Sequence, residues 1–292
     1  MLNYPTISQR QLSNNTRIIP RLDVLNNEFI SSFVPINNSI IHRAKTDICY
    51  SQIIEGNSSI VHGRAGNGKS GCIIELLEKL KDKNVVHLAL KLDRRHPEHT
   101  SEKFGQNMGL PASPILCLDA ISKTDEAVLI LDQLDAIRWT SVHSKTALEV
   151  CKEMIREAHY INKNRDKKIV IVLVCRTFDF ENDIGVKSLI TSNVEKDEQL
   201  SWKSISIDEL EEVEVKAVVG NEYDFFSKKM KEIIRNPNNL FIWTNLDEKR
   251  RNGIFISSSE LIKQWWNQIC YECEKIELTS YDIFRVRDTI VQ

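Results

Sequence analysis

One eight-residue segment has the residue types and spacing that bind phosphate groups. Residues 63–70 read Gly-Arg-Ala-Gly-Asn-Gly-Lys-Ser, which satisfies the P-loop pattern G-x-x-x-x-G-K-[ST]. Glycines let such a loop turn tightly, so that backbone amides of the loop and of the following helix point at phosphate oxygens. We expect Lys69 to reach the β-phosphate of ATP or ADP and the γ-phosphate of ATP, and the Ser70 hydroxyl to hold Mg²⁺. The residues that we assign to nucleotide contact here are Gly63, Arg64, Ala65, Gly66, Asn67, Gly68, Lys69, Ser70 and Gly71.

The segments on either side of this loop have the apolar patterns that the motif requires. Residues 59–62 are predicted to form a short strand, and residues 70–81 a helix with its apolar side chains on one face. Apolar runs predict further strands at 85–92, 127–131 and 169–175, a shorter strand holding Ile205 and Ile207, and a long helix at 146–161. Because several strands are apolar throughout and alternate with helices, we predict an α/β fold with a five-stranded parallel sheet covered by helices.

An acid at the end of a second strand completes the expected phosphate site. Residues 127–131 are apolar and lead into Asp132, at the carboxyl end of a strand, where α/β sheets bind ligands. We assign Asp132 to the metal side of the site together with Ser70; the alternative is a helix cap. The next residue is Gln133 rather than an acid that orients the attacking water. Asp135 is the substitute candidate for that role, and its alternative is to cap the following helix.

A strand that ends in arginine is predicted to lie between the phosphate-loop strand and the acidic strand. Only the strand at 85–92 separates Ser70 from Asp132 in the sequence, so these two strands are not expected to be neighbours. Residues 169–175 are the natural occupant of the position between them. Arg176 then stands at the nucleotide edge of the sheet, where a guanidinium can sense a γ-phosphate. The alternative is an ion pair with Asp179, Glu181 or Asp183. Our catalytic candidates are therefore Lys69, Asp135 and Arg176.

The chain divides into three predicted regions. Residues 1–38 have no sustained apolar period and are interpreted as an N-terminal arm or linker. Residues 39–207 hold the predicted sheet. Beyond residue 208 the strand signal stops, and we predict a small all-helical lid domain over 208–292, which begins with a helix capped by Asp208 and continues in helical spacing at 223–234.

Composition excludes several classes of protein. The formal net charge is -2, so no strong overall field favours nucleic acid or an acidic membrane surface. No apolar run approaches the roughly 20 residues that span a bilayer. The seven cysteines are scattered and odd in number, which fits a reduced cytoplasmic setting better than a disulfide framework.

Several stretches together resemble the STAND class of signalling NTPases, which contains the NACHT and NB-ARC domains. The likeness is strongest to the bacterial antiviral (AVAST-type) STAND ATPases, and it runs from about residue 39 to residue 265. The stretches that carry it are VHGRAGNGKSG at 61–71, LILDQLDA at 129–136, VLVCRTFD at 172–179 and RNPNNL at 235–240, with LKLDRRHP at 90–97 and GLPASP at 109–114.

This resemblance implies further residues and a mode of action. Arg43 is similar to an arginine that lies near the nucleotide base, Arg176 matches the sensor arginine, and Pro237 matches a proline that packs on bound nucleotide. From the residues alone, Pro237 indicates only that a helix begins there. The family binds ATP or ADP with Mg²⁺, and its nucleotide state controls conformation and homo-oligomerisation.

The sequence also departs from the family and leaves alternatives open. Asp-Gln-Leu-Asp at 132–135 stands where NACHT proteins have Asp-Gly-x-Asp-Glu, so binding is implied more strongly than hydrolysis. The effector and sensor modules of such proteins are not expected within this chain, which we interpret as a fragment, a split gene product or a subunit whose partner modules lie on other chains. One rival function is a DNA-associated ATPase of the AAA+ kind, and the other is a scaffold that binds ATP without hydrolysing it.

Overall fold

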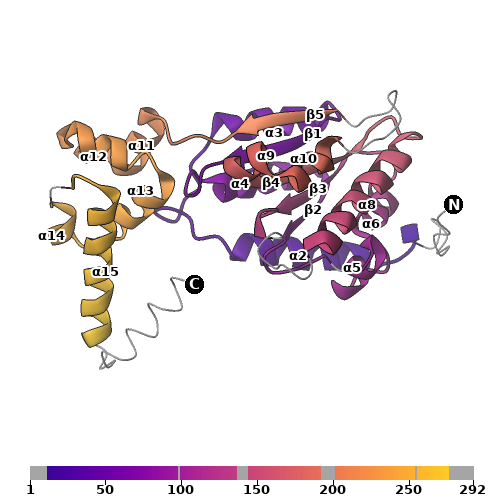
Figure 1. Cartoon of the computed structure of the whole chain (residues 1–292), viewed down its shortest axis with the longest axis horizontal. Helices are drawn as coiled ribbons and strands as arrows, with labels where there is room; N and C mark the ends of the chain where they lie inside the picture. Colours follow the sequence, from indigo (N-terminus) through magenta and orange to yellow (C-terminus); the bar gives the residue numbers. More distant parts are fainter. Residues whose placement is uncertain (1–11, 98, 137–143, 192–200, 254, 276–292) are drawn as a thin grey trace. The chain divides into compact units, whose positions relative to one another are not determined.

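A five-stranded parallel sheet forms the centre of the first part of the chain. The computed structural model describes residues 12–97, 99–136, 144–191, 201–253 and 255–275. Figure 1 shows β5 at the upper edge of the sheet and β2 at its lower edge, in the order β2-β3-β4-β1-β5. The predicted strands and the inserted position of β4 are confirmed. The strands are β1 (Ser58–Gly63), β2 (Val86–Lys91), β3 (Ala127–Asp132), β4 (Ile169–Arg176) and β5 (Trp202–Ser206).

Helices cover both faces of this sheet, as the apolar strands require. Every residue of β3 is buried, and so is every residue of β4 before Arg176. One group of helices packs through α6 on β2, β3 and β4 and through α8 on β4, whereas α3 and α4 pack on each other and on β1. The helices of this unit are α2 (Ile18–Ser31), α3 (Ala44–Ile54), α4 (Lys69–Asp82), α5 (Ser101–Asn107), α6 (Pro114–Ser122), α8 (Ser144–Asn162), α9 (Thr177–Asn182) and α10 (Ile184–Thr191).

Helix α2 corrects the interpretation of residues 1–38 as an arm. Residues 18–31 are helical and pack along β2, so this part of the N-terminal region belongs to the core of the sheet unit. The Asn26 side chain donates to the carbonyl of His87 and accepts from the amide of Ala89, which satisfies backbone groups on the outer edge of β2. The buried apolar residues recur at helical spacing, but the exposed Ile19 and Val24 and the proline at position 20 obscure the period: Ile18, Leu22, Leu25 and Phe29.

The register of the parallel strands brings the predicted site residues together at the carboxyl ends of the strands. Gly63, the last residue of β1, pairs with Arg176, the last residue of β4. On the other side of β4, Leu131 pairs with Leu173, so Asp132 follows at the same level of the sheet. The carboxyl ends of parallel strands lie on the same side of a sheet. This side, the nucleotide edge, therefore holds the start of the phosphate loop, the acid of β3 and the arginine of β4.

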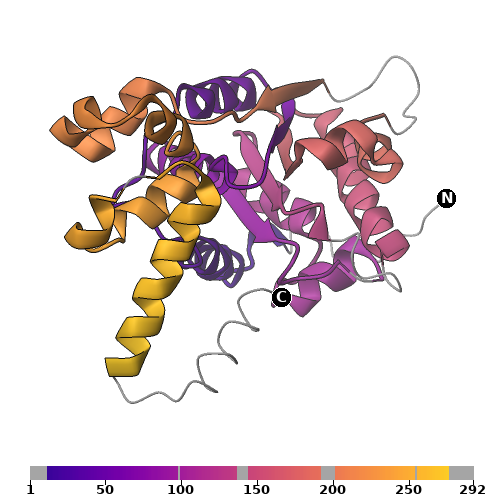
Figure 2. The ribbon, with the colours of Figure 1, turned by 60° about the vertical axis from the view of Figure 1, so that its left-hand side comes forward.

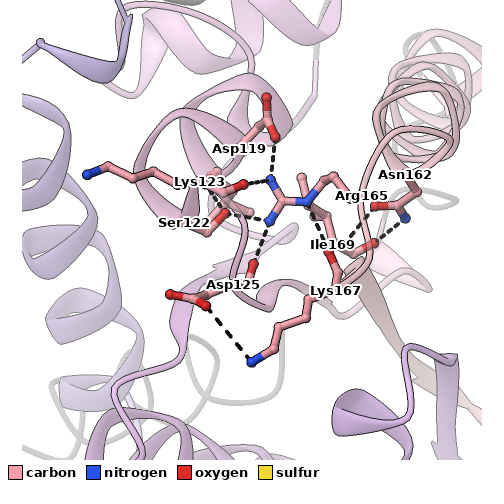
Figure 3. A network of polar contacts seen from close by, with 9 residues as sticks. Asp119, Ser122, Lys123, Asp125, Asn162, Arg165, Lys167 and Ile169 are labelled. Carbon is pink, nitrogen blue, oxygen red and sulfur yellow. Dashed lines mark hydrogen bonds and ion pairs between the residues drawn. The ribbon is translucent and has the colours of Figure 1, made fainter.

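At the amino-terminal ends of the strands, one buried arginine connects two loops. Arg165, in the loop between α8 and β4, forms an ion pair with Asp119 of α6, and both side chains are almost fully buried. Figure 3 shows its guanidinium also donating to the Ser122 hydroxyl and to the carbonyls of Lys123 and Asp125. These bonds join the loop before β3 to the loop before β4.

A second compact unit is built mainly of helices in the part of the chain that the structure describes, with an isolated bridge between Ile36 and Ser39. It comprises Pro35–Ile41, Gly66–Gly68 and the described residues from Glu209 onward. Tyr223, Ile234 and Trp243 lie in its apolar core. Within this unit, α15 runs away from α11 and α12 in both views (Figures 1 and 2). Its helices are α11 (Glu212–Val219), the 3-10 helix η1 (Gly220–Phe225), α12 (Lys228–Ile233), α13 (Pro237–Thr244), α14 (Glu248–Arg251) and α15 (Ser258–Lys275).

Two local predictions in this region are wrong. Asp208 does not cap the first helix; Glu211 does, in a capping box in which the Glu214 carboxylate accepts from its backbone amide at 2.7 Å. The predicted helix at 223–234 is interrupted, because the Ser227 hydroxyl accepts from the amide of Met230 and starts α12 as a separate helix.

Within the described ranges, every helix is too short or too polar to traverse a lipid bilayer.

Candidate nucleotide site

The phosphate loop joins the end of β1 to the start of α4, as the motif predicts. A Cβ on Gly63 would lie 2.5 Å from the carbonyl oxygen of Ile207, so only glycine allows the chain to leave the sheet at this point. Lys69, Ser70 and Gly71 form the first turn of α4. The Lys69 ammonium donates to the carbonyls of Gly63 and Arg64 at 3.0 and 3.2 Å, so it lies over the loop.

Lys69 lies in the combined field of the other predicted site residues. Burial lowers the pKa of Lys69, and the carboxylates of Asp135 and Asp132 oppose that shift, while Arg176 adds to it. The structure therefore brings Lys69, Asp132, Asp135 and Arg176 together, although they come from α4, β3, the segment after β3, and β4. A half-buried ammonium of this kind is suited to anionic oxygens, because phosphate would replace the neutral carbonyls as its partner.

Asp132 is a buried acid with an unused oxygen. Its side chain is 2% exposed, and Oδ1 accepts from the backbone amide of Gln133 at 2.9 Å. Among the described residues, Oδ2 has no hydrogen-bond partner. Burial raises the pKa of Asp132 to about 6, against the lowering effects of Lys91 and Lys69. A buried carboxylate with a spare oxygen is costly unless a cation compensates it.

The residues at this edge fit a hydrated Mg²⁺ ion. Ser70 supplies a hydroxyl at the start of α4, and Asp132 supplies a carboxylate oxygen that no described residue satisfies. Mg²⁺ prefers such oxygen ligands and keeps several waters, so it is bound by one or two protein groups together with substrate phosphates. Ser70 and Asp132 are therefore the residues that would hold it.

Replacing Asp132 with asparagine should stabilise the nucleotide-free protein. The pKa of Asp132 is raised from 3.8 to about 6 on folding, so the folded state is destabilised as the pH rises through that interval. At about pH 8 the free energy of unfolding of the variant should exceed that of the wild type by ~3 kcal/mol, and at about pH 5 by roughly half as much. Urea denaturation at the two pH values measures this difference. An equal difference at both would contradict the assignment of the cost to ionised Asp132.

Asp135 and Arg176 form an ion pair with each other. Arg176 Nε lies 2.8 Å from Oδ2 of Asp135, with the Arg176 side chain half exposed and that of Asp135 largely buried. The amide of Leu134 donates to the carbonyl of Val174, so the segment after β3 is fastened to β4 just before the arginine. From the sequence, the alternative was an ion pair between Arg176 and one of three nearby acids. The structure instead shows an ion pair between two of our catalytic candidates. Asp135 is thereby less available as a base.

Gln133 has an unusual backbone and a specific side-chain partner. Its φ is +63°, in the left-handed region that residues other than glycine, asparagine and aspartate rarely adopt. Its amide group lies against the carboxylate of Asp93, which follows β2. With the nitrogen facing the carboxylate, the distances are 2.8 Å to Oδ2 and 3.3 Å to Oδ1.

The two residues that only the family resemblance suggested occupy different units. Arg43 is buried before α3, where its amide donates to Glu75 and its guanidinium donates to the carbonyl of Asp208. Pro237 is the first residue of α13, so the predicted helix start is confirmed. Neither contact set assigns a nucleotide role, and both roles stay predictions.

Asn236, which precedes Pro237, was not singled out from the sequence. Its side chain accepts from the amides of Asn238 and Asn239 and caps α13. A Cβ on Gly66 would lie 2.9 Å from the Asn236 side-chain oxygen, and the Asn238 amide donates to the Gly66 carbonyl at 3.4 Å. The tip of the phosphate loop therefore packs on the start of α13. Asparagine before proline is a readable helix-start signal, but its contact with Gly66 is not.

Asp93 was also missed as a site residue. It directly follows the predicted strand 85–92 and is an acid at a strand end, which is the same signal that identified Asp132. The sequence contains that signal, but it does not show which strand lies beside β3. The structure shows that this strand is β2, because Lys91 pairs with Asp132, and this pairing brings Asp93 close to Gln133.

Comparisons with known proteins find only distant similarities to solved structures. No protein-family model and no curated protein matches the chain. Similar solved structures include the Orc1 protein of Aeropyrum pernix in complex with DNA (10% identity, TM-score 0.44), covering 89% of this chain and 70% of that one. A Walker-type ATPase of Pyrococcus abyssi has 11% identity and a TM-score of 0.49, covering 82% of this chain and 76% of that chain.

A third similar structure is a STAND protein with a tetratricopeptide repeat sensor from Pyrococcus horikoshii. Its identity is 12% and its TM-score 0.44, with 80% of this chain but only 33% of that chain covered. No activity, ligand or partner follows from similarity at this level. The fold itself rests on the strand order and on the position of the phosphate loop between β1 and α4.

Proposed function

We propose that this protein is a nucleotide-dependent switch of the STAND type, which binds ATP or ADP with Mg²⁺ and changes conformation with the nucleotide bound. The binding part of the proposal is supported by Lys69, Asp132 and Arg176, which lie at one edge of the sheet beside the phosphate loop. Mg²⁺ would supply positive charge to the phosphates there. The resemblance to antiviral STAND ATPases extends the proposal to bacterial antiviral defence.

The switching part is supported by one observation, the packing of the phosphate loop tip within the helical unit. Residues 63–65 and 69–71 belong to the sheet unit, whereas Gly66–Gly68 group with α13 and its neighbours. The Asn238 amide donates to the Gly66 carbonyl, and the Asn236 side chain lies against Gly66. A phosphate group that reorients the loop must therefore disturb the start of α13. Such coupling requires that ATP and ADP favour different states.

Arg176 is the residue through which we expect ATP and ADP to be distinguished. Its guanidinium is half exposed at the nucleotide edge and is already oriented by Asp135. A γ-phosphate would attract it more strongly than the carboxylate alone, because it adds charge-assisted hydrogen bonds. ADP lacks that group, so ADP binding should not depend on Arg176.

Replacing Arg176 with alanine should therefore weaken ATP binding about tenfold and leave ADP binding unchanged. It should also remove any ATP-specific change in hydrogen exchange of α11–α15 and any ATP-dependent self-association seen by light scattering. Lys187→Ala, an exposed cation on α10, is the matched control. If hydrogen exchange of wild-type α11–α15 is the same with MgATP as with MgADP, the switch proposal is wrong. DNA-stimulated turnover that salt abolishes would favour the DNA-associated rival.

A second function, ATP binding without hydrolysis, is favoured by one observation. No acid directly follows Asp132, and Asp135 is paired with Arg176. Under this reading the purified protein would retain ATP and release no phosphate over hours.

A further inference from the structure

The structure offers a group that can orient a water molecule in place of the missing acid. We propose that Gln133 is the water-positioning residue of a slow ATPase and that Asp93 is the positioning residue that holds its side-chain amide. This inference rests on the proposed function, because it requires ATP at the edge that holds Asp132 and Lys69. It concerns only how phosphate release occurs once ATP is bound.

The backbone at Gln133 is held in its left-handed conformation from both sides. The Gln133 amide donates to Asp132 Oδ1 at 2.9 Å, and the next amide, that of Leu134, donates to the Val174 carbonyl at 3.1 Å. A non-glycine residue keeps such a conformation only where its surroundings enforce it, and these residues cluster at functional sites. Here the enforced turn directs the side chain of Gln133 towards the end of β2 and Asp93.

The chemistry of the two side chains fixes which way the amide faces. A glutamine amide has a donor end and an acceptor end, whereas an ionised carboxylate only accepts. The nitrogen of Gln133 must therefore face Asp93, at 2.8 Å from Oδ2. The amide oxygen, which is the acceptor end, is then the end of the Gln133 side chain that does not bond to Asp93. Without Asp93 the amide has no reason to prefer this orientation.

A glutamine acceptor directly after Asp132 has a defined use in ATP hydrolysis. A water that donates a hydrogen bond to the Gln133 oxygen presents a lone pair to the γ-phosphorus, and glutamine performs this task in some GTPases. The water oxygen forms the new bond to phosphorus, the bond from phosphorus to the β–γ bridging oxygen breaks, and ADP leaves. The water proton passes to the released phosphate, because an amide cannot take it. Asp135 is less suited to this role, since Arg176 holds its carboxylate.

Replacing Asp93 with asparagine tests this assignment, because asparagine fills the same space but accepts either end of the amide. We expect kcat for ATP to fall about 10- to 100-fold, with the Kd for MgATP unchanged. Gln133→Asn is a second variant, since asparagine tolerates the left-handed backbone but is one methylene too short, and its kcat should fall similarly. Asp166→Asn, an exposed acid before β4, is the control and should leave kcat unchanged.

A double variant separates positioning from a general structural effect. If Asp93 acts through Gln133, adding Asp93→Asn to Gln133→Ala should not lower kcat further. The inference is overturned if Asp93→Asn leaves kcat unchanged, if it lowers kcat equally in the Gln133→Ala background, or if wild-type protein binds MgATP without releasing phosphate. That last outcome leaves the binding switch intact. Wild-type protein that does not bind MgATP would overturn the proposed function as well.

Discussion

Replacing Lys69 with alanine should weaken binding of both MgATP and MgADP by at least about 100-fold, or ~3 kcal/mol. The ammonium lies over the phosphate loop, bonded to the carbonyls of Gly63 and Arg64, and is half buried. Its charge would pair with the phosphates held by the loop, and alanine leaves the phosphates without that partner. Isothermal titration calorimetry with each nucleotide measures the loss directly.

The control for this variant lies on the same helix. Lys81 is exposed near the end of α4, so Lys81→Ala removes the same charge without touching the loop and should bind nucleotide like the wild type. Unfolding of the two variants should be similar in the absence of nucleotide. A Lys69→Ala protein that binds MgATP as tightly as the wild type would refute the phosphate site, whatever its hydrolytic activity.

Replacing Arg165 with alanine should lower the free energy of unfolding by about 4 kcal/mol, because it leaves the buried carboxylate of Asp119 unpaired. The guanidinium also donates to the carbonyls of Lys123 and Asp125, and the hydroxyl of Ser122 is a further partner. These acceptors lie at the end of α6 and in the loop that precedes β3, and they lose their donor together. The total free energy of unfolding of a typical domain is only about 5–15 kcal/mol, so this single loss is large.

Urea denaturation of the nucleotide-free protein measures this effect. Arg165→Lys keeps the positive charge but cannot reproduce the fork of donors, so it should lie between the wild type and Arg165→Ala. Lys167→Ala is the matched control: its side chain is exposed, and its backbone carbonyl, which accepts from Arg165, is unchanged. An Arg165→Ala variant with the midpoint of the control would show that the buried network does not stabilise the fold. If that variant does not fold, Asp119→Asn tests the same pair, because it removes the charge and keeps the volume.

The sheet and its phosphate loop could be predicted because their signals are local. Five apolar residues before Asp132, seven in 169–175 and the glycine–lysine pattern at 63–70 each identify an element within a short window. Even the inserted position of β4 could be inferred from the order of strands along the chain. Helix α2 was missed for the converse reason: the exposed apolar residues Ile19 and Val24, with the proline at position 20, obscure the helical spacing of the buried residues, which becomes meaningful only once β2 lies beside it.

The sequence by itself determined which groups can bind phosphate and metal: the loop 63–70, with Lys69 and Ser70, and Asp132 at a strand end. The tertiary structure alone decided how the remaining side chains are paired. Arg176 meets Asp135 and not its neighbours in sequence, Gln133 meets Asp93, and Arg165 meets Asp119. Each pair joins residues from different segments, and the order and register of parallel strands decide which side chains come within hydrogen-bond distance. Local patterns specify a residue's chemistry, but its partner depends on the packing of the whole sheet.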